Sequence, residues 1–224
     1  MKSGNNIACF IGIKHDSKRL IGKNLKILGD KPLYRHQLDV IKNLKCFDDI
    51  YVDTDSNEII DYCENNNIKT IERIPELLKD SASGNDLLNH WVNLKPNYDI
   101  YYHMHITNPF MTKESIQDCV DILISNEKYD SIFSAIEEKH WYWFDNKPVN
   151  YDPLNFGRSQ DEKGVIRETV SLYGIRREAF LKRKSKIGEN PFMYNVSQIE
   201  ALDIDTEFDW IIAERVYKYL NSKK

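Results

Sequence analysis

Residues 7–24 read IACFIGIKHDSKRLIGKN, an apolar run followed at once by a cluster of cations. The apolar part, from Ile7 to Ile13, is typical of a buried β-strand. The loop that follows, from Lys14 to Asn24, contains four Lys or Arg residues, a serine and an asparagine. Such a loop at the C-terminal end of a first strand is where an open α/β sheet binds a polyphosphate. The alternative is a solvated loop, because charge runs usually only face water.

The composition is that of an ordinary folded protein. The chain has 224 residues, of which 41% are hydrophobic and 29% are charged. Length alone permits one or two domains, and we expect one domain spanning residues 1–224. The net charge of −4 argues against a nucleic-acid partner, whose binding surface would be basic. No apolar run approaches the length of a membrane span, and no signal-peptide pattern is visible.

The four cysteines indicate a reducing compartment. Cys9, Cys46, Cys63 and Cys119 form no CxxC pair, and a chain of this length does not need disulfides to fold. We therefore expect free thiols and a cytoplasmic location.

Strand-like runs alternate with helical patterns up to residue 136. This alternation predicts a three-layer α/β sandwich with a mainly parallel sheet and right-handed crossovers. The expected strands are 7–13, 49–52, 68–71, 98–105 and 131–136, and the expected helices are 32–44, 56–66, 84–94 and 112–125.

The pattern changes after residue 136. An aromatic run, WYWF at 141–144, precedes a stretch rich in Asp, Asn, Pro and Gly. Residues 137–168 are too many for a simple loop, so we interpret them as a protruding lid or dimerisation arm. We expect the aromatic run to form the core of a dimer interface and not a surface on which a ligand stacks. A strand at 169–175 and helices at 177–182 and 206–220 complete the expectation.

Six segments, in order along nearly the whole chain, resemble the acylneuraminate cytidylyltransferases, the family of the CMP-sialic acid synthetases. The resemblance implies a Rossmann-like nucleotidyltransferase fold, a homodimer, and transfer of CMP from CTP to a sugar acid for surface glycan synthesis, with release of pyrophosphate. The matching segments are GIKHDSKR with KN and LGDKPL in 12–33, VDTDS at 52–56, RIPELLKDSAS at 73–83, HITNPFMT at 105–112, RSQD at 158–161 and DIDTEFD at 203–209.

The resemblance also implies which residues bind the nucleotide. Lys14, Arg19 and Lys23, with Asp205, are the expected catalytic residues. Three of these assignments have alternatives that need no nucleotide. Lys14 could be solvated, Asn24 could cap a helix, and residues 81–83 could be a plain loop at the start of a helix. The complete expected nucleotide set is Lys14, Ser17, Arg19, Lys23, Asn24, Arg73, Ser81, Ala82 and Ser83.

Asp203 and Asp205 are the expected ligands of a magnesium ion. Alternation along an extended segment places both carboxylates on one face and Ile204 in the core, and paired carboxylates suit Mg²⁺. The rival interpretation is that Asp205 or Thr206 only caps the C-terminal helix.

The expected acceptor-binding residues are His105, Arg158, Gln160 and Tyr173. Arg158 is suited to a carboxylate or phosphate, because a guanidinium binds such groups in a bidentate way. A surface arginine is its alternative interpretation. His103 and His105 share a strand face. Three roles are open for them: contact with the acceptor, a structural role, and a transition-metal site.

The acceptor motifs depart from the family more than the nucleotide motifs do. Met111 stands where the family has an arginine, and Glu168 to Tyr173 replaces its NGAIY motif. We therefore expect retained CTP chemistry with an acceptor other than sialic acid. The rival functions are a nucleotidyltransferase that makes a CDP-linked product from a phosphorylated acceptor and a non-catalytic nucleotide-binding protein. A Rossmann oxidoreductase is excluded because no GxGxxG follows the first strand.

Overall fold

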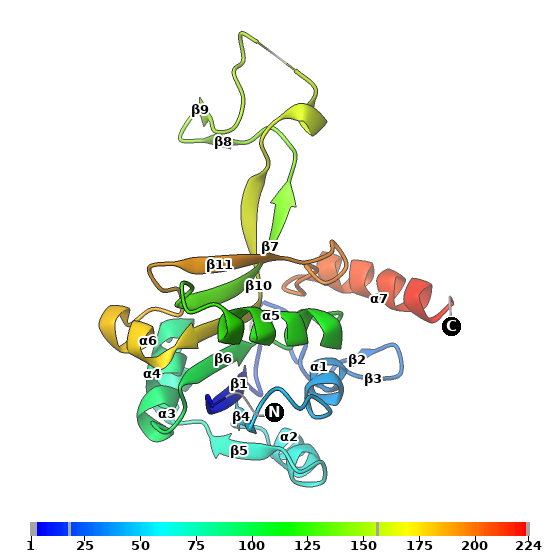
Figure 1. Ribbon diagram of the computed structural model, residues 1–224. Coiled ribbons are helices and arrows are strands. Elements are labelled where there is room, and N and C mark those ends of the chain that lie inside the picture. The colour runs from blue at the N-terminus through cyan, green and yellow to red at the C-terminus, as the bar shows by residue number, and fades with distance from the viewer. Residues whose placement is uncertain (1–3, 18, 156, 223–224) are drawn as a thin grey trace.

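The computed structural model describes residues 4–17, 19–155 and 157–222. Its main element is a seven-stranded sheet with the order β11-β7-β10-β6-β1-β4-β5 (Figure 1). Within the described residues only β10 runs antiparallel to its neighbours. The sheet strands are β1 Ile7–Ile13, β4 Asp49–Thr54, β5 Lys69–Glu72, β6 Ile100–Met104, β7 Ser131–Glu138, β10 Val165–Arg176 and β11 Pro191–Asn195.

Helices cover both faces of this sheet. The helices are α1 Leu33–Ile41, α2 Asn57–Glu64, α3 Pro75–Leu78, α4 Gly84–Leu94, α5 Lys113–Ser125, α6 Arg177–Arg183 and α7 Glu207–Asn221. Two short hairpins, β2 Ile27–Leu28 with β3 Lys31–Pro32 and β8 Trp143–Phe144 with β9 Lys147–Pro148, and the 3₁₀ turn η1 Ser159–Asp161 complete the structure. In the described part of the chain, none of the helices combines the length and apolar character needed to span a bilayer.

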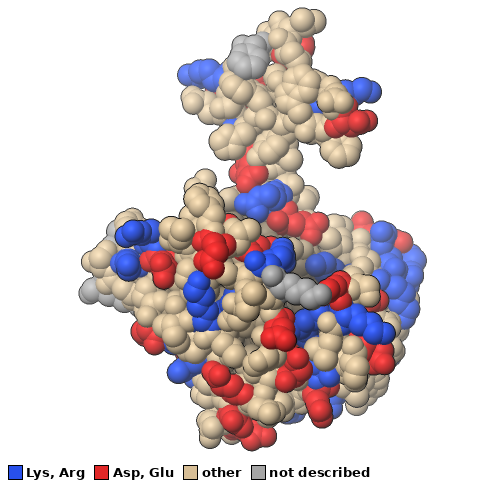
Figure 2. Space-filling view, turned by 180° about the vertical axis from the view of Figure 1, so that it is seen from behind, with Lys and Arg blue, Asp and Glu red and all other residues tan. Residues whose placement is uncertain are grey.

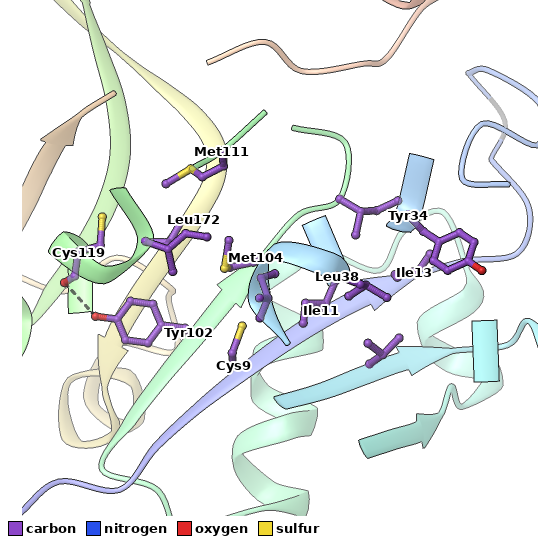
Figure 3. Close-up of a cluster of buried hydrophobic side chains, with 14 of the residues drawn as sticks. Cys9, Ile11, Ile13, Tyr34, Leu38, Tyr102, Met104, Met111, Cys119 and Leu172 are labelled. Atoms are coloured by element: carbon purple, nitrogen blue, oxygen red, sulfur yellow. Dashed lines mark hydrogen bonds between the residues drawn. The ribbon is translucent and has the colours of Figure 1, made fainter. Parts of the chain in front are cut away.

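Alternation along β1 separates two hydrophobic cores. Cys9, Ile11 and Ile13 point to the face covered by α1, α2, α5 and α7 (Figure 3). There Tyr102 from β6 donates a hydrogen bond from its hydroxyl to the carbonyl of Cys119 on α5, at 3.1 Å. Ala8 and Phe10 point to the opposite face, against α4 and α6. Period-two side chains on a strand buried on both faces explain why β1 is continuously apolar.

The predicted α/β sandwich is confirmed. The helix at 84–94 has the expected bounds, and Thr112 caps α5 by accepting a hydrogen bond from the Ser115 amide. β11 is missing from the prediction. Its sequence PFMYN begins with proline, which cannot donate to a ladder, and β11 lies at the edge of the sheet.

Residues 137–168 project from the body of the molecule (Figures 1 and 2). β7 and β10 pair as far as Glu138 and Val165, and the chain beyond them forms the β8–β9 hairpin and η1. Asp145 and Asn146, between β8 and β9, both have positive φ, which matches a type I′ turn. The segment carries large exposed hydrophobic side chains: Trp141, Trp143, Phe144, Val149, Leu154 and Ile166.

A buried ion pair lies behind the C-terminal end of β1. The fully buried Asp53 of β4 accepts from Arg73 Nε at 2.6 Å and from the Trp91 indole at 2.6 Å. Arg73 also donates to the carbonyl of Asp53 at 3.0 Å. Gly12 leaves room for the guanidinium, since a Cβ at this position would lie 2.6 Å from Arg73 Nη2. The network therefore joins β1, β4, the end of β5 and α4.

Replacing Asp53 with asparagine should destabilise the protein by about 3–5 kcal/mol, because it leaves the Arg73 guanidinium buried without its counter-charge. Urea denaturation measures this change. The same substitution at Asp61, which is exposed on α2, is the matched control and should change the free energy of unfolding by less than about 0.5 kcal/mol. Equal effects of the two substitutions would contradict a structural role for the network.

Candidate active site

A pocket of about 540 Å³ opens beyond the C-terminal ends of β1 and β6. In an open α/β sheet this edge is where ligands bind. A second pocket of similar volume, about 530 Å³, lies at the opposite end of β1, beside α5. Only the first pocket is lined by the predicted nucleotide residues. These lining residues are Lys14, Ser17, Arg19, Lys23, Asn24, Arg73 and Ala82.

Lys14 and Asn24 shape the loop after β1. The ammonium of Lys14 donates to the carbonyls of Leu78 at 2.8 Å and Lys79 at 3.2 Å. The buried Asn24 amide donates to the carbonyl of Lys14 at 2.7 Å. Lys14 is therefore not a solvated side chain, and Asn24 braces the loop. The alternative of a capping Asn24 is wrong, since α1 begins nine residues later, after Pro32.

Lys23 and Arg19 converge on Asp205. Lys23 is buried, and its ammonium donates to the carbonyl of Ile204 at 2.6 Å and to Asp205 Oδ1 at 3.0 Å. The guanidinium of Arg19, mostly exposed, donates to Asp205 Oδ2. Lys18, which also stands in this loop, lies outside the described residues. These ion pairs hold the loop after β1 against the segment that precedes α7.

Asp203 has an unsatisfied carboxylate oxygen. Its Oδ1 is buried and makes no hydrogen bond in the described structure. Burial, and to a smaller extent the neighbouring Asp205, raises the pKa of Asp203 above its ordinary value. Ile204 between them is completely buried, as the alternating pattern predicts. A carboxylate that is short of a partner is the donor that a divalent cation would satisfy, so the residues present fit a magnesium ion.

The helix-capping alternative is correct for Thr206 and not for Asp205. Thr206 is the N-cap of α7, and it forms a capping box with Asp209. The carboxylate of Asp205 is therefore left to Lys23 and Arg19. Among the described residues no cluster of three or more His, Cys, Asp or Glu side chains could hold a metal, so most magnesium ligands would come from phosphate and water.

The loop before α4 divides into structural and pocket residues. Ser83 is the N-cap of α4, and its hydroxyl and amide exchange hydrogen bonds with Asp86. Ser81 is exposed, whereas Ala82 and Gly84 line the pocket. The plain helix-start interpretation therefore accounts for Ser83.

His103 and His105 share a face, as predicted, and stack with ring centroids 4.3 Å apart. His103 Nδ1 and His105 Nε2 are buried without hydrogen-bond partners in the described structure. Burial lowers the pKa of His103 well below its ordinary value. Burial, followed by the positive charges of Lys186 and Lys23, lowers that of His105 to about 3. Both imidazoles are therefore neutral at physiological pH, and both line the pocket.

Tyr173 lies beyond His105, at the bulge in β10. The pairing of β10 with β7 shifts register between Glu168 and Tyr173, and Val170 there has a φ of 53°. A left-handed conformation is rare for a β-branched residue, and such strain gathers at functional sites. Tyr173 donates from its hydroxyl to Glu168 at 2.7 Å, and its ring centroid lies 6.4 Å from that of His105.

Arg158 and Gln160 are carried away from this pocket. Both are exposed at η1 on the projecting segment, and Arg158 pairs with Asp161 at 2.7 Å. The projecting segment that contains η1 stands away from the body of the molecule (Figure 1). His105 and Tyr173 are together in the body, with ring centroids 6.4 Å apart. Within one chain, Arg158 is therefore a surface arginine, which is the alternative to its role in acceptor binding.

Several residues of the site carry no clear signal in the sequence. Trp91 reads as an ordinary helix residue, yet its indole donates to Asp53; Asp53 lies in the family-like segment VDTDS, but nothing in that segment indicates its pairing with Arg73. Lys186 belongs to the stretch KRKSK at 182–186, which has the look of a solvated basic run. Only the close approach of Gly12 to Arg73 has a sequence correlate, a glycine at the end of an apolar strand.

The histidine pair predicts a pH-dependent stability. The unfolded chain has a histidine pKa of about 6.5, so between pH 6.5 and 3 it binds a proton that folded His105 does not bind. Stability should therefore fall as the pH drops through this window. In His105→Gln, the slope between pH 6.5 and 5 should be smaller by up to about 1.4 kcal/mol per pH unit, measured by urea denaturation. An unchanged slope would contradict the burial of a neutral His105. His140→Gln, on the exposed arm, controls for general effects of removing an imidazole.

Comparison with known proteins agrees with this geometry. The profile of the cytidylyltransferase family matches residues 8–219. The chain is 29% identical over 218 residues to an N-acylneuraminate cytidylyltransferase of Oncorhynchus mykiss, covering 94% of this chain and 50% of that protein. It is 25% identical over 226 residues to a CMP-N,N'-diacetyllegionaminic acid synthase of Legionella pneumophila, covering 94% and 95%. The chain thus spans about half the length of the first of these relatives.

Solved structures share the fold. A CMP:2-keto-3-deoxy-manno-octonic acid synthetase complexed with CTP superposes with a TM-score of 0.70 at 16% identity, covering 96% of this chain and 99% of the other. A 4-diphosphocytidyl-2C-methyl-D-erythritol synthase from Anaerococcus prevotii gives 0.68 at 16% identity, covering 97% and 98%. With the family profile spanning nearly the whole sequence, the conclusion is that this chain belongs to the cytidylyltransferase family.

Proposed function

We propose that this chain transfers CMP from CTP to a sugar acid or similar anionic acceptor and releases pyrophosphate. The observation that carries the proposal is the convergence of Lys14, Arg19 and Lys23 on one pocket beside two aspartates, in a chain of the cytidylyltransferase family. A triphosphate needs several cations, and the pocket supplies them on one loop.

Each cation keeps hydrogen-bonding capacity for phosphate. An ammonium has three donors, and Lys14 and Lys23 each use two in the structure. Arg19 has five donors and bonds to Asp205. The remaining N–H groups would bind the oxygens of the triphosphate and stabilise charge that grows on the leaving pyrophosphate.

In the proposed reaction an acceptor oxygen forms a bond to the α-phosphorus of CTP. The bond from that phosphorus to the bridging oxygen breaks, and pyrophosphate leaves with the electron pair. An acceptor hydroxyl gives up its proton in this step, whereas a carboxylate or phosphate acceptor has none to lose. A magnesium ion held by Asp203 and Asp205 would neutralise part of the negative charge of the phosphates.

We infer an acceptor other than sialic acid from the positions that depart from the family. Met111 is buried in the hydrophobic core, so this position offers the acceptor no cation. Val170 lies on the strained bulge of β10 beside Tyr173, at the pocket's acceptor side. A related nonulosonate, another sugar acid or a smaller anion would fit.

We further propose that the arm pairs two subunits. Phe144 and Leu154 are 79% and 96% exposed, which is unusual for large apolar side chains and typical of interface residues. The arm stands clear of the body, and its surface carries fewer charged side chains than the body does (Figure 2). Arg158 and Gln160 lie on the same arm, so pairing could bring them to the acceptor in a second subunit.

Pyrophosphate release from CTP, UTP, ATP and GTP tests the reaction. With Mg²⁺ and a panel of sugar acids and small phosphorylated acceptors, we expect release with CTP and one acceptor class. Release with a phosphorylated acceptor alone would favour the CDP-linked alternative. Turnover of N-acetylneuraminate as efficient as that of every other acceptor would contradict the inferred change of acceptor. Failure of the protein to bind CTP would refute the proposal.

The two aspartates should respond differently to alanine substitution. Asp203→Ala should abolish turnover and leave stability unchanged or higher, because it removes a partly buried carboxylate whose Oδ1 has no hydrogen-bond partner in the described structure. Asp205→Ala should abolish turnover and also destabilise the protein by about 3 kcal/mol, because Lys23 stays buried without its counter-charge. Pyrophosphate release and urea denaturation measure the two properties.

Glu207→Ala is the matched control for these variants. Glu207 is an exposed acidic residue next to the same segment, and its pair with Lys26 is at the surface. It should keep both turnover and stability. A fully active Asp205→Ala protein would refute the metal assignment.

A further inference from the structure

Lys186, which lies outside the predicted motifs, places an ammonium beside the pocket, next to its lining residue Gly84. It lies between α6 and β11, and its backbone amide donates to Asn85 Oδ1 of α4 at 2.9 Å. Its ammonium stands over the ring of Tyr173, 3.6 Å from the centroid. The side chain of Lys186 is therefore directed toward the bulge of β10, away from the basic surface run that contains it.

Gly84 shows how close this ammonium is to the pocket. A Cβ built at Gly84 would lie 3.6 Å from Lys186 Nζ and 3.7 Å from His103 Cε1. Gly84, His103 and His105 all line the pocket. The missing side chain at Gly84 thus leaves space between the ammonium and the histidine stack.

The ammonium of Lys186 is short of partners. Among the described residues it makes no hydrogen bond or ion pair, and its contact is the face of the Tyr173 ring. The nearby Glu168 accepts instead from the hydroxyl of Tyr173 at 2.7 Å. Burial lowers the pKa of Lys186, as expected for a cation without enough polar contacts. The two neutral imidazoles nearby each have one buried ring nitrogen without a hydrogen-bond partner in the described structure, and they offer no opposite charge.

His105 lies between Lys186 and the predicted triphosphate side. The positive charges of Lys186 and Lys23 both lower the pKa of His105, and Lys186 has the larger effect. Lys23 belongs to the loop after β1, whereas Lys186 comes from the opposite side, with Tyr173. Two separate cationic regions therefore lie on either side of the histidine stack, one in the loop after β1 and one at Lys186, and the triphosphate would occupy only the first.

We propose that Lys186 determines acceptor specificity by binding an anionic group of the acceptor, a carboxylate or a phosphate, above the ring of Tyr173 and against the His103–His105 stack. This inference rests on the proposed cytidylyl transfer. An acceptor anion would complete the hydrogen bonds of the ammonium, and the neutral imidazoles beside it would not repel the acceptor.

The test compares Lys186→Met, Lys186→Arg and the control Lys184→Met. Methionine keeps the apolar stem and removes the charge, whereas arginine keeps the charge. Lys184 is exposed two residues away. Pyrophosphate release is measured at varied CTP and varied acceptor, using N-acetylneuraminate, 2-keto-3-deoxy-manno-octonate and 2-C-methyl-D-erythritol 4-phosphate. The first two carry a carboxylate and the third a phosphate, so they separate the two sources of the anion.

We expect Lys186→Met to raise the KM for the anionic acceptor at least about tenfold, which matches the loss of one charge-assisted hydrogen bond. The KM for CTP should stay within about twofold, Lys186→Arg should restore part of the acceptor affinity, and Lys184→Met should resemble wild type. Calorimetric titration of each acceptor into CMP-saturated protein, where no transfer occurs, should show the same order. The methyl ester of N-acetylneuraminate, which is neutral, should be insensitive to Lys186→Met.

The outcomes separate this inference from the proposed function. Wild-type protein that does not bind CTP would overturn the proposed function itself. Protein that binds CTP and uses an acceptor with unchanged KM after Lys186→Met would overturn only the role of Lys186. Protein that binds CTP but none of the three anions in calorimetry would also overturn that role.

Discussion

The buried pair of Asp53 and Arg73 is the constraint on which the pocket depends. A charge in a protein interior is tolerated only when its partners are complete, and here Trp91 and the backbone carbonyl of Asp53 complete them. Because Gly12 has no side chain, the guanidinium can reach the back of β1 and face the pocket. The floor of the nucleotide site is thus a rigid, charged layer built from residues of four elements.

The front of the pocket is held by a different kind of contact. Lys14, Lys23 and Arg19 all bond to atoms far away in sequence, on the segments around residues 78 and 205. These bonds keep a loop rich in like charges folded, and Asp205 balances two of the cations. A bound triphosphate would use the N–H groups that these bonds leave available. The loop can therefore be ordered before its ligand arrives, which favours affinity.

The region around Tyr173 and the histidine stack is stabilised in a different way. In the histidine stack, His103 Nδ1 and His105 Nε2 are buried and have no hydrogen-bond partner in the described structure, and the Lys186 ammonium lies on the Tyr173 ring. Unsatisfied polar groups and a strained Val170 lower stability, so a ligand that completes their bonds gains affinity there. The arm adds an exposed apolar surface that a soluble domain does not need for its own folding.

The sequence by itself determined the layered α/β fold, since periodicity and strand–helix alternation are local properties that survive in any such fold. It also indicated the loop after β1 and the two aspartates, because charge and alternation can be read from neighbouring residues. Only the tertiary structure decided that Asp53 pairs with Arg73, that Asn24 braces a loop, and that the Lys186 ammonium lies over Tyr173 beside the pocket. It also placed Arg158 and Gln160 outside the pocket of their own chain. These outcomes depend on which distant segments pack together, and a lysine in a basic run looks the same in sequence whether its ammonium faces water or an aromatic ring.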